Sequence, residues 1–566
     1  MNDFHFDFDN SFGVYHQLPD IPSDVSNLSL SKRLILNVYP LLNNYHNTSY
    51  DYAYWLALLM PSTQVWIESV YDRFQIDIDS DFLPFTDLND DYICANHQRL
   101  NYNLIKDIYI YRYGKLQSQV LPNSDQSRLS LQTKHRNVKA KLKLINRIKK
   151  VLKLFSLSFL EIISYRIYLF RQFIFYLVTK ASNKTHHGYI LQQILSTSRF
   201  RKLIKRLTSV DIHYLALNRI PGALLSRQDC SDFRSSLLNF DYESTNPYII
   251  KFISNHYTKY IPDYALEEFR SYHKFFKDYS CHTLVVKCSN SLEPSFRHAF
   301  ASLYQNARQI INFQHGGGYG LYDAAYHKLE KELSDSFVSW RDEKRDGTIG
   351  LVTGYSVHPT IKKHRHTNVK NILIIAPFFK PFHRYNLGVH PYYNNIIATR
   401  IIEFIHLLKA NDFNVTYRPY SKSPDKISKY FGFSVSSETI ESQIQSAYHI
   451  VVCKPTTAPT ECLVQGRLPI LFFGEEEPLN PESNESLLKL AKYGFYTPDV
   501  KTCYQSILND VPHSTSIDDL NIVMQEFNAL FGSRLSTVDQ IIEVISNNSV
   551  KTSLPYNIIS SPRITH

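Results

Sequence analysis

Residues 309–320 of the 566-residue chain read QIINFQHGGGYG, a short apolar segment followed at once by glycines. The apolar part, Gln309 to Phe313, has the length and composition of a buried strand. The glycines permit backbone conformations and close approaches that side chains would block. A strand that ends in such a turn is typical of an open α/β sheet, which binds ligands at the carboxyl ends of its strands. We therefore predict an α/β fold with a binding site beside this turn.

Apolar segments alternate with helical sequence on both sides of the turn. Before it, Thr283 to Val286 has the character of another short buried strand. After it, a helix is predicted around 394–409. Four further strands are predicted at 371–376, 414–418, 449–453 and 468–473. Strands that alternate with helices indicate doubly wound parallel sheets.

The chain is too long for one core, because single cores stop growing at about 250–300 residues. We expect two doubly wound parallel-sheet domains that face a cleft. The N-terminal domain is expected over 31–360, opens with helices, and follows a disordered or loosely packed segment, 1–30. The C-terminal domain is expected over 361–510, followed by C-terminal helices and a tail over 511–566.

A basic segment interrupts the N-terminal half. Between Lys134 and Lys153 the chain carries nine Lys and Arg residues and no acid, interleaved with Leu, Ile and Val. This pattern predicts a basic amphipathic helix within a helical insertion at about 130–206. The helix either covers the core or docks on an anionic membrane surface, where each basic residue contributes about 1 kcal/mol. No recognition motif accompanies the charge, so nucleic acid is not an expected partner.

Three features favour a cytoplasmic location, peripheral at the inner face of the membrane if the basic helix docks there. The seven cysteines are scattered, as is typical of reduced thiols. The first residues lack the basic start and apolar run of a signal peptide. The apolar stretch from Phe155 to Val178 is interrupted by Glu161, Arg166 and Arg171, so we predict a buried or interfacial helix pair.

His315 opens the glycine turn at the carboxyl end of a predicted strand. Its imidazole could donate a hydrogen bond to a phosphate or sugar oxygen, or act as an acid or base. The alternative is a histidine that only bonds the tight turn. We favour a functional role, because three consecutive glycines weaken a structure unless something uses the space.

A second candidate site follows the strand predicted at 449–453. Thr456 and Thr457 precede Pro459, and proline is favoured in the first turn of a helix, so we place the threonines at a helix N-terminus. Free amides and the helix dipole bind anions there, so a phosphate could be held without a metal. Simple N-capping would explain one threonine. Glu461, one turn into the helix, would cap it or bind a nucleoside hydroxyl.

Arg418 is the third candidate. It ends a predicted strand, and Pro419 turns the chain away, which leaves the guanidinium at the carboxyl edge of the sheet. A surface ion pair is the alternative. The sequence has neither a DxD-like acidic pair at a strand end nor the spacing of a zinc site, so we expect no metal and no other cofactor.

At these residues the sequence resembles bacterial surface-polysaccharide transferases of GT-B type, and it is distantly similar to the Kdo transferases of capsule and lipopolysaccharide. The turn at 455–459 departs from the Asn-Ser-Thr-like turn of the relatives but keeps its hydroxyls. The matching pieces follow the family order: Tyr54-Trp55, Tyr71-Asp72-Arg73-Phe74, Ile261-Pro262-Asp263-Tyr264 with Glu267 and Phe269, Gln314-His315-Gly316-Gly317 with Tyr319-Gly320, Arg418-Pro419-Tyr420, and Thr456-Thr457 with Glu461.

The resemblance implies a metal-independent glycosyltransferase that transfers a sugar from a nucleotide-sugar donor to a glycan or lipid-linked acceptor. The distant relatives use CMP-activated ulosonic acids such as Kdo, whose carboxylate and phosphate would give Arg418 and His315 separate partners. His315 is the implied catalytic residue, with Glu267 and Asp72 as candidates for the base or nucleophile. The implied donor-binding residues are Gln314, Gly316, Gly317, Tyr319, Arg418, Thr456, Thr457 and Glu461.

Two other functions stay open at this point. One is transfer of polyol phosphate or another CDP-linked group. The other is a non-catalytic scaffold that keeps the fold and uses the basic helix to assemble a biosynthetic complex. Nucleotide binding separates the scaffold from both enzymes, and a comparison of donors separates the enzymes from each other.

Overall fold

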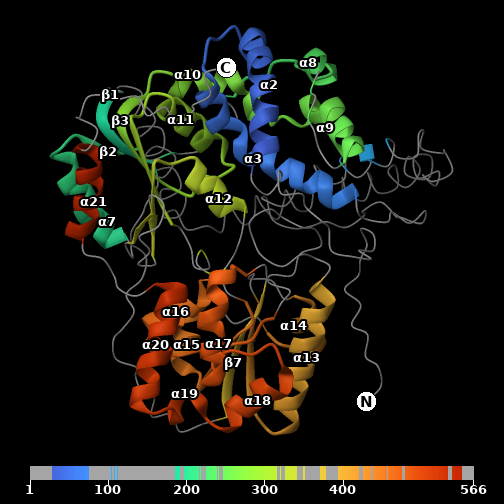
Figure 1. The fold of residues 1–566 in the computed structure, drawn as a ribbon, viewed down its shortest axis with the longest axis vertical. Coiled ribbons are helices and arrows are strands. Elements are labelled where there is room, and N and C mark those ends of the chain that lie inside the picture. The colour runs from blue at the N-terminus through green and yellow to red at the C-terminus, as the bar shows by residue number, and fades with distance from the viewer. Residues whose placement is uncertain are drawn as a thin grey trace, which may run out of the picture. The chain divides into compact units, whose positions relative to one another are not determined.

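The computed structural model describes residues 28–74 and most of 185–550 (Figure 1). Only four residues between 75 and 184 are described, and the larger later gaps are 218–224, 315–324 apart from 319 and 321, 341–347, 351–369 and 378–392. The chain divides into two compact units, one of Met1–Asp77 with Thr185–His566 and one of Ile78–Lys184. The predicted basic helix and the apolar stretch Phe155–Val178 fall in the second unit, outside the described residues.

The first sheet has six parallel strands in the order β2-β1-β3-β4-β5-β6. Their bounds are β1 Thr185–Ile190, β2 Ile212–Tyr214, β3 Ser280–Lys287, β4 Gln309–Phe313, β5 Ser336–Ser339 and β6 Thr348–Gly350. Strands β3 and β4 lie where the sequence predicts them. Strand β1 was not predicted, and it lies inside the range expected for a helical insertion. Its sequence, THHGYI, has few apolar residues and so lacks the signal of a buried strand. Gly188 suits this strand, since an added Cβ would lie 3.0 Å from the carbonyl oxygen of Thr283.

One face of the first sheet is covered by two helices that are more than 300 residues apart in the sequence. They are α7, Thr197–Thr208, and α21, Val538–Val550 (Figure 1). Val285 and Phe313 pack there with Leu203 of α7 and Ile541 of α21. An ion pair between Arg206 and Asp539 joins the two helices at the surface. The last described helix of the chain therefore completes the core of the first sheet.

The first sheet also carries two helices from between its own strands. Helix α11, Pro294–Tyr304, contacts β3, and α12, Ala325–Glu332, contacts β5. Pro294 lies in the first turn of α11, and the Glu293 side chain caps the helix by accepting a hydrogen bond from the backbone N of Phe296 at 2.6 Å. These are the favoured residues for a helix start.

The helical opening expected from the sequence is present as α2, Ser29–His46, and α3, Tyr52–Phe74. Three more helices follow the first two strands: α8 Ser231–Ser235, α9 Pro247–Tyr260 and α10 Phe269–Phe276. Trp55 stacks on Phe269 at 5.3 Å between ring centroids, and His46 stacks on the same ring at 4.1 Å. Two motif pieces that are far apart in the sequence thus meet in one buried aromatic cluster, which is stabilised by ring stacking.

The second sheet has four parallel strands in the order β10-β9-β7-β8. They lie at the predicted positions: β7 Asn371–Ile375, β8 Asn414–Arg418, β9 His449–Val452 and β10 Ile470–Leu471. Numbered within their own sheets, the first four strands of both sheets run second, first, third, fourth. The protein is therefore an α/β protein with two parallel sheets wound in the same way.

Helices cover both faces of the second sheet. Ile374 and Val451 point to one face, where they pack with α13, α14 and α18, while Leu373 and Val452 point to the other, where they pack with α15, α16, α17 and α20. The bounds are α13 Asn394–Ala410, α14 Lys426–Phe431, α15 Ile440–Ser446, α16 Ala458–Val464, α17 Asn484–Lys492, α18 Val500–Leu508, α19 Val511–Ser514 and α20 Ile517–Phe531. Strands buried on both faces explain the continuous apolar runs in the sequence.

The described residues also bear on the compartment. Six of the cysteines are described and all six are free thiols, five of them buried. In this part of the chain, the helices are all too short or too polar to cross a membrane.

Gly532 joins α20 to the segment that leads to α21. Its φ is 98°, and an added Cβ would lie 2.6 Å from the carbonyl oxygen of Trp340. We expect Gly532→Ala to lower the free energy of unfolding by roughly 1–3 kcal/mol through backbone strain and by about 1–3 kcal/mol more through the overlap. Denaturation by urea measures the loss.

Gly432→Ala is the matched control for this substitution. Gly432 has a φ of 68°, and no described atom lies within 4 Å of an added Cβ. In this variant the free energy of unfolding should fall only by the cost of the left-handed backbone conformation, roughly 1–2 kcal/mol. Equal losses in the two variants would show that the contact with Trp340 does not constrain the chain.

Candidate functional site

The carboxyl ends of the second sheet's strands lie side by side. Arg418 of β8 pairs with Ile375 of β7, which pairs with Val452 of β9. The order of the strands reverses between β7 and β9. Open α/β sheets bind ligands at the carboxyl edge where such a reversal occurs. This edge of the second sheet is therefore the candidate binding site for a ligand.

Thr457 lies at the start of α16, just beyond this edge, as the sequence predicts. It is the N-cap residue, and its carbonyl accepts the first helical hydrogen bond from Glu461 N at 3.0 Å. Its side chain, however, does not cap the helix. Pro459 lies in the first turn. Thr456 lies outside the described residues.

Arg418 is half-buried at the end of β8. Its Nη1 donates to the Glu438 carbonyl at 3.2 Å and to Gln443 Oε1 at 2.5 Å. Gln443 is itself buried on α15. Within the described residues Arg418 forms no ion pair, so the alternative of a surface ion pair finds no partner there. One edge of the guanidinium is thus fixed by two neutral hydrogen-bond acceptors.

Glu461, also at this edge, has an unusually high pKa for a carboxyl group. Burial raises the pKa of Glu461 to about 7, with a further contribution from the charge of Glu441, while Arg418 acts in the opposite direction. Near neutral pH such a carboxyl is a mixture of protonated and ionised forms. It can therefore donate or accept a hydrogen bond, which suits a hydroxyl-bearing ligand.

The first sheet holds Gln314 at its own carboxyl edge, directly after β4. Gln314 is buried, and its Oε1 accepts hydrogen bonds from Trp340 N at 2.8 Å and Ser339 Oγ at 3.2 Å. Its backbone N donates to the Val338 carbonyl at 2.9 Å. Gln314 thus ties β4 to β5 immediately before the glycine turn. His315, Gly316 and Gly317 lie outside the described residues.

Tyr319, at the other end of the glycine turn, is anchored to α12. Its hydroxyl donates to Glu330 Oε2 at 2.6 Å, and its ring stacks on His327 at 3.8 Å between centroids. Glu330 is completely buried. The two described ends of the turn, Gln314 and Tyr319, are therefore both fastened to the body of the first sheet.

Buried polar residues that the sequence analysis missed support the same edge. Asn312 of β4 donates to Ser289 Oγ at 2.7 Å and to the Glu330 carbonyl at 3.0 Å. Arg297 of α11 is fully buried and donates to the Ala57 carbonyl at 2.9 Å and to the Ser289 carbonyl. A polar residue inside the apolar run QIINF was a usable signal for Asn312. No such signal pointed to Arg297, because the sequence of its helix has an ordinary composition.

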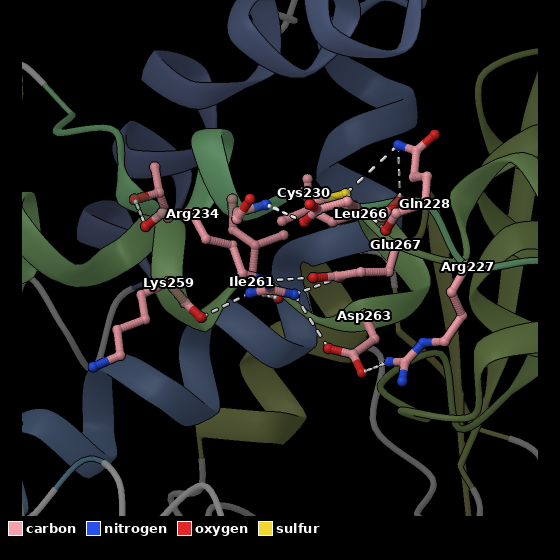
Figure 2. Close-up of polar contacts among 12 residues, drawn as sticks. Arg227, Gln228, Cys230, Arg234, Lys259, Ile261, Asp263, Leu266 and Glu267 are labelled. Carbon is pink, nitrogen blue, oxygen red and sulfur yellow. Dashed lines mark hydrogen bonds and ion pairs between the residues drawn. The ribbon is translucent and has the colours of Figure 1, made fainter.

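Glu267 lies in a separate network around Arg234 of α8 (Figure 2). Arg234 Nη2 donates to Glu267 Oε2 at 2.6 Å and to Asp263 Oδ1 at 3.1 Å, and Arg234 Nε donates to Glu267 Oε1. Arg234 Nη1 donates to the carbonyls of Lys259 and Ile261 at 2.7 and 2.9 Å. This network fastens the loop that follows α9.

The ion pair determines how basic Glu267 can be. Burial raises the pKa of Glu267, but the hydrogen bonds and charge of Arg234 outweigh this and lower it overall. A carboxylate with both oxygens held by a guanidinium is a weak base. A catalytic role would require Arg234 to release Glu267. The other candidate, Asp72, lies on α3, and its side chain is outside the description.

The unusual pKa of Glu461 makes the protein's stability depend on pH. A raised pKa means that the protonated acid is stable in the fold, and this stability is lost as pH rises from about 4.5, the ordinary value, through about 7. We expect the loss to reach about 1–3 kcal/mol in the wild type and to be absent in Glu461→Gln. The Gln variant should therefore gain stability over the wild type between pH 5 and pH 8.

Urea denaturation at both pH values measures this difference. Glu403→Gln is the matched control, because Glu403 is an exposed carboxylate on α13. A difference between Glu461→Gln and the wild type that stays constant with pH would contradict the assignment of a buried, protonated acid.

A family profile matches most of the chain. Residues 24–503 match the family profile of the LIC12162 family transferase, a range that runs from before α2 into α18 and includes both sheets. No curated protein matches the chain. Because the match extends over most of the sequence, the chain belongs to the LIC12162 family of transferases.

Proposed function

We propose that the protein is a GT-B-type glycosyltransferase of cell-surface polysaccharide biosynthesis. It would transfer a sugar from a nucleotide donor to a glycan or lipid-linked acceptor at the cytoplasmic face of the membrane, with residues 134–153 as the contact to anionic lipid. Membership in a transferase family and two similarly wound parallel sheets support the proposal. The observation that carries it is the gathering of Arg418, Thr457 and Glu461 where the strand order of the second sheet reverses.

Each of these residues has a proposed partner on the donor. Thr457, with Thr456, would bind the phosphate at the start of α16, where free backbone amides favour an anion. The charge of Arg418 would bind a second anionic group, such as the carboxylate of a CMP-activated ulosonic acid like Kdo. Glu461 would bind a nucleoside hydroxyl. Gln314, Gly316, Gly317 and Tyr319 would shape the glycine turn that contacts the donor from the first sheet.

The proposed reaction needs no metal. The acceptor hydroxyl oxygen bonds to the anomeric carbon, the bond from that carbon to the phosphate oxygen breaks, and the acceptor proton passes to a base. A protonated His315 would stabilise the charge that develops on the leaving phosphate. Asp72 and Glu267 are the proposed candidates for the base, Glu267 only if Arg234 releases it.

One observation favours a second candidate function. The turn at 455–459, PTTAP, departs from the Asn-Ser-Thr-like turn of the resembling enzymes at the position proposed to contact the phosphate. A transferase of polyol phosphate or another CDP-linked group would use the same edge with a diphosphate donor. The two functions differ in which nucleotide binds and which group moves.

Nucleotide binding is the first test. We expect CMP to raise the melting temperature more than CDP, UDP or GDP, whereas a polyol-phosphate transferase would prefer CDP. Thr457→Val and Arg418→Gln should weaken binding roughly 5- to 150-fold, because each removes a hydrogen bond to a charged group. Thr416→Val is the control, since Thr416 is exposed on β8 before the edge. A protein that binds none of the four nucleotides would be the scaffold, not the enzyme.

Turnover is the second test, with His315→Ala as the variant. Removal of a preorganised donor to the developing charge should lower kcat by about 10²–10³-fold. The melting temperature should change little, because His315 is followed in the sequence by glycines, which offer its ring no apolar side chain to pack against. Unchanged turnover together with a large fall in melting temperature would show that His315 only holds its turn.

A further inference from the structure

Three side chains of the kind that bind metal ions gather at the amino end of the second sheet. His449 is the first residue of β9. Asp510 is the N-cap residue of α19, and His513 lies within this helix. One ligand atom of each lies within 4.8 Å of the others, and this is the one such group of three within the described ranges. Helices α19 and α16 lie toward opposite ends of this sheet (Figure 1). The group is therefore remote from the edge proposed for the donor.

The pair of His449 and Asp510 has the spacing of two ligands and not of a hydrogen bond. His449 Nε2 lies 3.6 Å from Asp510 Oδ1. This distance is beyond a normal hydrogen bond. It is close to the ~3.4 Å that separates two ligand atoms around a tetrahedral zinc ion with bonds of ~2.0–2.1 Å.

Asp510 keeps one buried carboxylate oxygen unused. The Tyr448 hydroxyl donates to Asp510 Oδ2 at 2.9 Å, which orients the carboxylate. Asp510 Oδ1 is buried and accepts no hydrogen bond from any described residue. A buried acceptor without a partner is costly, so such atoms in native proteins usually meet a water or an ion.

His513 is held in the tautomer that a metal requires. Its Nε2 lies 3.1 Å from the Tyr448 carbonyl, which can only accept, so Nε2 carries the proton and Nδ1 carries the lone pair. Arg467 Nη2 donates to the same carbonyl at 2.7 Å and fixes its position. Metal-binding histidines typically donate their other ring N–H to a carbonyl in this way.

His449 also lacks another partner. It is buried, and its Nδ1 forms no hydrogen bond within the described part of the chain. Asp510 is the acid that approaches its ring. All three residues thus offer one ligand atom within 4.8 Å of the others, and each residue is restrained by burial or by a contact with Tyr448.

We propose that His449, Asp510 and His513 bind a zinc ion, with water as the fourth ligand. Two imidazoles and one carboxylate are a donor set that zinc accepts, whereas Mg²⁺ and Ca²⁺ prefer oxygen alone. The ion would link the start of β9 to the segment between α18 and α19, remote from the edge proposed for the donor, so we expect it to stabilise the fold. The sequence spacing gives no zinc signature, because His449 lies far from the Asp-x-x-His segment of α19.

Zinc binding to the full-length chain tests the proposal directly. The protein is stripped with a chelator, dialysed against Zn²⁺ or Mg²⁺, and analysed for bound metal and melting temperature. We expect one zinc per chain and a rise of roughly 5 °C when zinc exceeds its dissociation constant 100-fold. Mg²⁺ should not bind. Failure to retain zinc under these conditions would overturn the proposal.

Variants locate the ion. Asp510→Asn keeps the shape of the side chain and should weaken zinc binding at least 10-fold, as should His513→Ala. Tyr448→Phe removes the hydroxyl that orients Asp510 and should weaken zinc binding about 10- to 100-fold with little change in the metal-free melting temperature. His406→Ala is the matched control, because His406 is an exposed histidine on α13. Equal zinc binding by Asp510→Asn, His513→Ala and the control would show that the ion binds elsewhere.

The proposals for the zinc site and for the donor-binding edge can be tested independently of each other. Removal of zinc should lower the melting temperature but leave the nucleotide preference of the folded protein unchanged, because the two sites lie at opposite ends of the second sheet. Zinc required for nucleotide binding in the folded protein would contradict a purely structural role. Absence of nucleotide binding would leave the zinc result intact.

Discussion

Parallel strand pairing is the constraint on which the rest of the structure depends. Each connection between parallel strands must cross a face of the sheet, so both faces are covered by helices and all carboxyl ends share one edge. The second sheet follows this rule with helices on both of its faces. The first sheet follows it with α21, which comes from the end of the chain and buries Ile541 and Ile545 against the strands. The rigid edge that results is a suitable base for a binding site.

The two carboxyl edges are prepared in different ways. At the first sheet, Gln314, Asn312 and Arg297 satisfy backbone and side-chain groups beneath the glycine turn, so the turn starts from a fixed frame. At the second sheet, Arg418 is held by neutral hydrogen-bond acceptors, and the half-buried Glu461 has a raised pKa. Hydrogen-bonded networks give rigidity, whereas charged groups with shifted pKa values are typical of functional sites. The contrast supports the second sheet as the donor side of the proposed enzyme.

The network around Arg234 shows why an acid in a sequence motif is not automatically a catalytic one. Glu267 was a candidate base or nucleophile from the sequence, yet both of its oxygens are bound to Arg234 (Figure 2). The same guanidinium closes the end of α9 through the carbonyls of Lys259 and Ile261. Bidentate pairs of this kind fix geometry. In the described conformation, Asp263 and Glu267 thus organise the loop between α9 and α10.

The sequence by itself determined the elements whose signals are local. Strands β4, β7 and β9 could be predicted because strands buried on both faces are continuous apolar runs, and the start of α16 because Pro459 favours a first helical turn. Only the tertiary structure decided the strand order, the place of the polar strand β1, the return of α21, the raised pKa of Glu461 and the meeting of His449 with Asp510. Each of these depends on burial and on contacts between residues far apart in the chain, and no pattern within one segment records them.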